Sequence, residues 1–125
     1  MDVLSAPGAP AAVGPYSHAV RAGGLVFCSG QVALDPETNM LVGSDAAAQT
    51  TQVFRNIRAV LEAAGLELSD VVKTTVLLAS MTDYGTVNAV YAEAFGDHRP
   101  ARSAFATGGL PLGALVEIEV IAAAR

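Results

Sequence analysis

Two kinds of apolar periodicity divide the chain into predicted helices and strands. The longest helical pattern runs from Asp45 to Ala64, where apolar side chains recur three and four residues apart. Ser44 or Asp45 can cap the start of this helix, and Gly65 suits its C-terminal end. The predicted apolar face consists of Val53, Ile57, Val60, Leu61 and Ala64.

A second helix is predicted from about Asp83 to Phe95, with Thr82 as a possible cap and Gly96 at its end. One side of this helix is a stripe at helical spacing, made of Tyr84, Asn88, Tyr91 and Phe95. Asn88 interrupts the aromatic stripe, and its amide needs hydrogen-bond partners. The pattern allows either a core or interface hydrogen bond to backbone or a place in a binding site.

Segments rich in apolar and β-branched residues predict the strands. The first fifteen residues are expected to form an extended lead-in, because they contain Pro7, Pro10 and Pro15. Gly23-Gly24 and residues 108–113 predict turns, and residues 34–40 predict a loop. The predicted strands are residues 16–22, 25–32, 71–79, 101–106 and 115–123.

The resulting order, β-β-α-β-α-β-β, predicts one α+β domain over residues 1–125, with two helices on one face of a mixed sheet. The other face must meet water or another subunit. In the last strand, one face is purely apolar, whereas the other combines Glu117 and Glu119 with Leu115 and Ile121. A mixed face of this kind favours a subunit interface or the wall of a site over a fully solvated surface.

Composition adds to this expectation of hidden surface. The chain has 125 residues, of which 52% are hydrophobic and 15% charged, against about 25% charged in an average domain. The net charge of −5 and the lack of any Lys/Arg cluster argue against a nucleic-acid partner. The single cysteine, Cys28, excludes an internal disulfide, and its place inside an apolar strand predicts a buried, unreactive thiol. No signal peptide or membrane-spanning run is recognisable, so a cytoplasmic location and no membrane contact are expected.

Arg102 is the main candidate for chemistry. It stands one residue into a short, half-apolar strand, and its planar guanidinium can hold a carboxylate through two parallel hydrogen bonds. Because the chain is acidic overall, a small carboxylate ligand is a better partner than a phosphate polymer. An internal ion pair with Glu117 or Glu119 is the alternative.

Other candidates depend on their local setting. Tyr16 follows a Gly-Pro pair that restricts the backbone, so its ring can cover a pocket or simply pack. Ser29-Gly30 ends a buried strand where glycine permits a ligand to approach the backbone, or it is only a strand end. A carboxylate at Glu117 or Glu119 can orient a water or move a proton, or it can form an interface ion pair.

Several chemistries find little support. His18 and His98 are far apart and lack metal-binding spacing, so no metal site is predicted. No glycine-rich phosphate loop is present, and no cofactor is expected. Lys73, the only lysine, stays open as a Schiff-base residue, although an exposed or edge lysine is the simpler interpretation.

Six separated motifs resemble the RidA family, also called YjgF or perchloric-acid-soluble protein, in order and spacing over residues 7 to 124. They are GPYSHAV, LVFCSGQV, QTTQVFRNIRAVLEAAGL, DVVKTTVLLASMTDYGTVNAVYAEAF, RPARSAF and VEIEVIA. The resemblance implies a chorismate-mutase-like fold and a homotrimer with sites in clefts between subunits. It implies hydrolysis of 2-imino acids and their enamine tautomers, such as 2-iminopropanoate and 2-aminoacrylate, to 2-keto acids and ammonia. Such an activity protects other enzymes from reactive metabolites.

The resemblance also implies roles for individual residues. Arg102 matches the family's carboxylate-binding arginine, and Glu117 matches its water-handling glutamate. The implied substrate-binding residues are Arg102, Tyr16, Ser29, Gly30, Asn88 and Ala104. Ala104 departs from the family, because many active members carry a cysteine there, and this affects the expected substrate range.

Two other functions compete with this one. The first is a binding module that captures small keto or imino acids without turnover, which Arg102 would serve equally well. The second is an endoribonuclease or translation inhibitor, a label sometimes attached to the family. The acidic net charge and the absence of a suitable histidine pair weigh against that second function.

Overall fold

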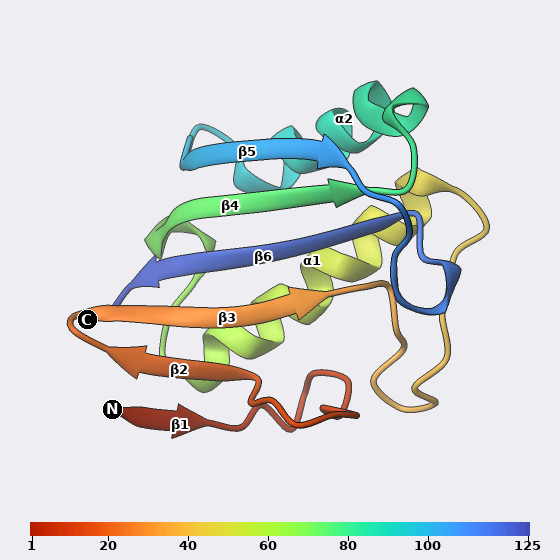
Figure 1. The fold of residues 1–125 in the computed structure, drawn as a ribbon. Coiled ribbons are helices and arrows are strands. Elements are labelled where there is room, and N and C mark those ends of the chain that lie inside the picture. Colours follow the sequence, from red (N-terminus) through yellow and green to blue (C-terminus); the bar gives the residue numbers. More distant parts are fainter.

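The computed structural model describes residues 1–125 and contains one six-stranded sheet with both helices on the same face (Figure 1). The strands are β1 (Asp2–Leu4), β2 (Ala19–Ala22), β3 (Leu25–Gln31), β4 (Val71–Leu78), β5 (Ala101–Ala106) and β6 (Val116–Ala123); the helices are α1 (Ala46–Ala63) and α2 (Tyr84–Phe95). The sheet order is β1-β2-β3-β6-β4-β5, and only the β4–β5 pair is parallel. This arrangement confirms the predicted α+β fold.

The predicted order lacks β1, so the full order is β-β-β-α-β-α-β-β. Strand β1 pairs antiparallel with β2 at the edge of the sheet, with Val3 opposite Val20. Its three residues are too few to display a period of two, so the lead-in prediction is wrong at this point. Strand β2 also starts later than predicted, at Ala19, because the Tyr16 amide donates to the Gly14 carbonyl in a tight turn at 2.9 Å.

Helix α1 begins and ends where the sequence predicts. The Asp45 side chain accepts a hydrogen bond from the Ala48 amide at 2.8 Å. Gly65 follows the helix with a φ of 74°, a conformation that glycine adopts without strain. Neither α1 nor α2 combines the length and the apolar character that crossing a bilayer would require.

The start of helix α2 differs in detail from the prediction. Residues Met81–Asp83 form a short 3₁₀ turn ahead of it, and the Ser80 side chain accepts a hydrogen bond from the Thr82 amide at 3.2 Å. Ser80 therefore caps this segment, and the prediction of Thr82 as the cap is wrong. Gly96 ends α2 with a φ of 62°, as predicted.

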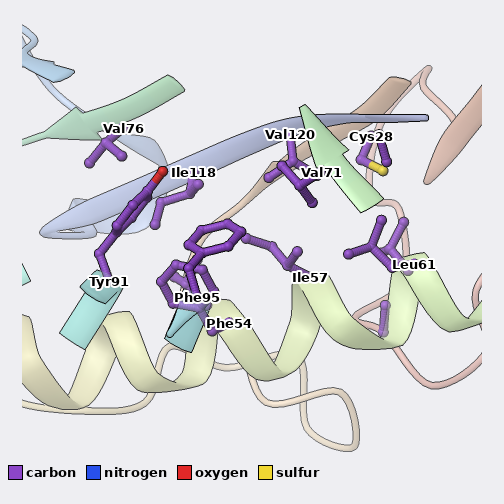
Figure 2. Close-up of a cluster of buried hydrophobic side chains, with 14 of the residues drawn as sticks. Cys28, Phe54, Ile57, Leu61, Val71, Val76, Tyr91, Phe95, Ile118 and Val120 are labelled. Atoms are coloured by element: carbon purple, nitrogen blue, oxygen red, sulfur yellow. The ribbon is translucent and has the colours of Figure 1, made fainter. Parts of the chain in front are cut away.

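The core lies between the helices and the sheet, as Figure 2 shows. Apolar side chains of α1, including Ile57 and Leu61, face Ile118 and Val120 of β6. The buried rings are Phe54, Tyr91 and Phe95, which pack edge-on or tilted with centroids 4.8 to 5.8 Å apart. Cys28 is buried with these groups, and burial raises the pKa of its thiol to about 11, which fits the predicted unreactive role.

The sheet face that carries no helix is uncovered and mixes apolar with polar side chains. It includes Phe27, which is 43% exposed, and Phe105, which is 49% exposed. On β6 this face carries Glu117 and Glu119, while Ile118 and its neighbours point into the core. The predicted two-sided character of the last strand is therefore confirmed. Exposed aromatic side chains on an uncovered sheet face commonly mark contacts with another protein.

Candidate functional site

The first group of candidate residues gathers around Arg102, between β5 and α2. In the register of the parallel pair, Arg102 lies opposite Thr74, which is fully buried on the helix-covered face. The Arg102 guanidinium donates to Asn88 Oδ1 at 2.7 Å and to the Tyr84 hydroxyl at 3.0 Å. Asn88 therefore lies against Arg102, through its side chain and not through the backbone contact that was one of its predicted alternatives.

An aromatic ring supports the other side of this guanidinium. The Arg102 Cζ atom lies 4.8 Å from the centroid of the Tyr91 ring, a cation–π distance. The Tyr91 hydroxyl is in turn 2.7 Å from the Thr74 hydroxyl in the core, which fixes the ring. Arg102 is thus held in one orientation before any ligand arrives.

Arg102 has no carboxylate partner within its own chain. The ion pairs of the chain join Arg21 to Asp2 and Arg125 to Glu67 and Asp70. The alternative of an internal ion pair with Glu117 or Glu119 is therefore wrong for the single chain. A guanidinium has five N–H donors, so Arg102 keeps donors for an external anion on the edge strand of the sheet.

The second group of candidate residues lines an open cleft of about 540 Å³, a size that suits a small organic ligand. Glu117 reaches it from β6, Ser29 and Gly30 from β3, and Tyr16 from the segment before β2. Further lining residues are Val13, Val32, Leu34, Pro111, Leu112 and Glu119. The sequence therefore identified polar residues that meet in one place, although they come from distant parts of the chain.

Gly30 lies directly against the Glu117 carboxylate. The register of β3 against β6 shifts between Cys28 and Gln31, which places Gly30 in an irregular stretch of the strand. A methyl group added to Gly30 would overlap the Glu117 side chain. The prediction that this glycine lets a ligand approach the backbone stays untested, but Gly30 does line the cleft and also makes room for Glu117.

The setting of Glu117 changes its acidity. Burial in the cleft wall raises the pKa of its carboxyl group, and the negative charge of Glu119 raises it further. A carboxyl group with a raised pKa exchanges protons closer to neutral pH, as a general acid–base residue requires. Sequence alone could not decide which glutamate faces the cleft, and both line it.

The Gly30–Glu117 contact makes a testable prediction about stability. We expect Gly30→Ala to displace the Glu117 carboxylate and to destabilise the fold by about 1 kcal/mol, the low end of the cost of overpacking, because the overlapping atoms belong to a flexible side chain; the thermal unfolding midpoint should fall by a few degrees. In a Glu117→Ala background the same change should cost much less, because the overlapping carboxylate is gone. Gly85→Ala is the matched control, since a Cβ at this α2 position would meet no atom within 4 Å. Equal destabilisation of Gly30→Ala in both backgrounds would contradict the contact.

Three further candidates differ in how far their side chains are already hydrogen-bonded. The Ser29 hydroxyl donates to the Ser17 carbonyl at 2.6 Å, so it fixes the segment leading into β2 and can offer only its lone pairs to a ligand. Tyr16 is 50% exposed at the cleft. The Lys73 ammonium donates to the Ser103 hydroxyl at 3.4 Å and does not line the cleft. Its position therefore argues against a Schiff-base role in this cleft.

The two groups lie on opposite faces of the sheet. Arg102 shares the helix-covered face with Thr74, and Ala104, opposite Val76, packs against the core on that face. Glu117 is paired with Leu77, the next residue along β4 from Val76, and so points the other way. A single chain therefore does not bring Arg102 together with Glu117.

Sequence reasoning missed several contributors. Tyr84 and Tyr91 were visible as an aromatic stripe, but nothing in the local pattern linked that stripe to Arg102. Leu112, with a φ of 60°, holds an unusual left-handed conformation for a non-glycine residue and lines the cleft. No three His, Cys, Asp or Glu side chains converge in a way that could hold a metal ion.

Comparison with known proteins places this arrangement in a family. A family model described as Endoribonuclease L-PSP matches residues 6–124. A mouse protein named 2-iminobutanoate/2-iminopropanoate deaminase is 48% identical over 120 residues, which cover 96% of this chain and 89% of the mouse protein.

Solved structures agree with this match. The crystal structure of RidA from the Antarctic bacterium Psychrobacter sp. PAMC 21119 is 44% identical, with a TM-score of 0.94 over 98% of this chain and 99% of that one. The YjgF gene product of E. coli is 41% identical, with a TM-score of 0.94 over 100% of both chains.

Proposed function

This chain belongs to the Endoribonuclease L-PSP family, which includes the YjgF and RidA proteins, and on that premise we propose that it hydrolyses 2-imino acids and their enamine tautomers to 2-keto acids and ammonia. Relatives at 42 to 48% identity carry the names Reactive Intermediate Deaminase A and 2-iminobutanoate/2-iminopropanoate deaminase. Those names support the reaction class. The residue roles below rest on the geometry of this chain.

The observation that carries the proposal is the complementarity of the two groups of residues. Among the residues that line the cleft, the charged ones are both acidic, Glu117 and Glu119. A substrate carboxylate would be repelled there unless a cation joined it. Arg102, fixed on the other face with unused donors, supplies such a cation when the β5 edge of one copy lies beside the cleft of another.

We infer that copies of the chain assemble through the uncovered sheet face into a homotrimer, with a site at each contact. The low charged fraction of 15% and the exposure of Phe27 and Phe105 favour burial of that face. Cyclic assembly repeats the same contact, so every site can combine Arg102 of one copy with the cleft of the next.

In the mechanism we propose, each residue has one task. Arg102 holds the substrate carboxylate through two hydrogen bonds, with Asn88 and the Tyr91 ring fixing the guanidinium. Tyr16 covers the bound acid from the cleft side. Glu117 accepts a proton from a water molecule and directs its oxygen onto the imine carbon.

The reaction balances without a cofactor. Attack of water on the C=N bond forms the C–O bond, and the imine nitrogen takes up the proton that Glu117 received. The resulting carbinolamine then passes its hydroxyl proton to the amino nitrogen, with Glu117 as the carrier, and its C–N bond breaks to give ammonia and the 2-keto acid. Because an imine carbon is already electrophilic, orientation and one proton-handling group supply about 10²–10⁴-fold of acceleration.

Two alternatives predict different behaviour. A pure binding module would use Arg102 and the cleft but would leave the imine intact. An endoribonuclease would need a cationic surface, and the chain has 7 basic against 12 acidic residues. His98 Nε2 donates a hydrogen bond to the Val71 carbonyl at 2.6 Å, and His98 is far in sequence from His18. The charge balance and the separation of the two histidines weigh against the endoribonuclease.

The direct test generates 2-iminopropanoate with an amino-acid oxidase and traps it with semicarbazide. We expect catalytic amounts of the protein to suppress semicarbazone formation and to release pyruvate and ammonia in equal amounts. Suppression that requires protein in stoichiometric proportion, without faster pyruvate release, would indicate the binding module. Cleavage of RNA with no effect on the imine would overturn the proposal.

A further inference from the structure

His18 forms two hydrogen bonds that together determine which nitrogen carries its proton. The Ala6 amide donates to His18 Nδ1 at 3.0 Å, so Nδ1 acts as the acceptor. Nε2 lies 2.7 Å from the Pro10 carbonyl, which can only accept, so Nε2 carries the hydrogen. The observed contacts therefore require the neutral imidazole with its proton on Nε2.

These bonds close a loop beside the cleft. The bond to Pro10 joins the two ends of residues 10–18, and this loop carries Val13 and Tyr16, which line the cleft. The His18 carbonyl also accepts from the Ser29 amide at 3.0 Å, which ties the end of the loop to β3. His18 thus holds loop 10–18, which forms one wall of the cleft, but His18 does not itself line the cleft.

We propose that His18 is a positioning residue that is sensitive to acid. Its neutral ring holds loop 10–18 in place, and protonation of Nδ1 frees the segment that carries Tyr16. Protonation places an N–H where the Ala6 amide now donates, so two donors face each other. Ala6 is 1% exposed, and its amide would be left without a partner in a buried position, which is destabilising.

No charged group forms an ion pair with the His18 ring. The small cavity beside the ring is lined by uncharged residues, namely Ser5, Ala6, Pro7, Ala9, Ala11 and Pro36. Neither β2 nor the facing part of β3 directs a charged side chain into an ion pair with it, since none of the ion pairs involves His18. The nearby loop contains Asp35 and Glu37, which also remain outside any ion pair with the ring.

The experiment measures amide hydrogen exchange of the assembled protein between about pH 5 and pH 8, where imidazoles change charge. Exchange is expressed as protection relative to the unstructured chain, which removes the intrinsic pH dependence. We expect protection of the Ala6 amide and of the Tyr16 amide, which bonds the Gly14 carbonyl, to fall at least tenfold on acidification. Protection in α1 should not change over the same interval.

The chain offers a matched control, because it has only two histidines. His98→Gln keeps His18 and should retain the acid-induced loss of protection. In His18→Gln and His18→Asn, whose amides can donate and accept but do not charge, protection should not depend on pH. Constant protection of the wild-type loop, or the same acid response in the His18 variants, would overturn the proposal.

The consequence for turnover rests on the proposed function. If imines are the substrates, the wild-type KM should rise on acidification, and His18→Gln should abolish that rise. The exchange measurement does not depend on any substrate. A protein that is inactive on imines but shows the loop release would contradict the proposed function and leave the His18 assignment standing.

Discussion

Replacing Arg102 with alanine is expected to lower kcat/KM for 2-iminopropanoate by about 10²–10⁴-fold. Two hydrogen bonds to a charged carboxylate contribute about 1.5–3 kcal/mol each, and each 1.36 kcal/mol corresponds to a tenfold change in rate. The main effect should fall on KM, since the carboxylate is held in the ground state and the transition state alike. Steady-state kinetics with the semicarbazide assay measure both parameters.

The structure suggests how to separate this loss from unfolding. Arg58→Ala removes an exposed arginine of α1 and should leave kcat/KM unchanged. Arg102→Lys should recover little activity, because an ammonium group cannot reproduce the planar fork that Asn88 and the Tyr84 hydroxyl hold. Wild-type kinetics in a folded Arg102→Ala protein would refute the assignment of Arg102.

Replacing Glu117 with glutamine is expected to lower kcat by about 10²–10⁴-fold, the usual contribution of one acid–base residue. The amide keeps the shape of the side chain beside Gly30 but cannot accept a proton from water. Binding of the product pyruvate, followed by calorimetry, should persist because Arg102 is intact. Persistence of turnover in Glu117→Gln would favour a different base.

The pH dependence of kcat/KM tests the same residue without removing it. Activity requires the ionised carboxylate, so it should fall with acid as pH drops through the raised pKa of Glu117. Removing the negative charge of Glu119 with Glu119→Gln should lower that pKa, and the acidic limb should move to lower pH. If the acidic limb of the pH profile stays in place or moves to higher pH, the charge of Glu119 does not raise the pKa of Glu117.

Mixing the Arg102→Ala and Glu117→Gln variants tests whether each site combines residues from two copies of the chain. When Arg102→Ala and Glu117→Gln chains are unfolded together and reassembled, about one quarter of the sites in a random cyclic oligomer should combine an intact arginine with an intact glutamate. Activity should then reappear in the mixture. No recovery in a correctly assembled mixture would mean that both residues act from the same copy.

Local patterns predicted most of the fold because helix limits are set by short-range chemistry. Asp45, Gly65 and Gly96 have the cap positions that their side chains or flexible backbones favour. Strand β1 escaped prediction because a three-residue edge strand depends on its partner β2 and not on its own pattern. Thr82 was misassigned because a 3₁₀ turn before α2 moved the capping role to Ser80.

The candidate site was predictable in its residues but not in its arrangement. Tyr16, Ser29, Gly30 and Glu117 were each notable in sequence, and they meet at one cleft. Their separation from Arg102 depends on the registers of β5 and β6 against β4, which put Arg102 and Glu117 on opposite faces, and local periodicity carries no information on which strands pair or in what register. The same holds for the stacking of Arg102 on Tyr91, which depends on how α2 lies across the sheet.

The placement of Arg102 and Glu117 on opposite faces also governs how output scales with the amount of protein. If each site needs two copies, an isolated chain contributes nothing, and the rate rises more steeply than linearly with chain concentration until assembly is complete. A newly synthesised chain then gains its chemistry only when neighbours are abundant. If the proposed assembly forms the sites, the geometry of one sheet sets a concentration threshold below which the chain is present but inactive.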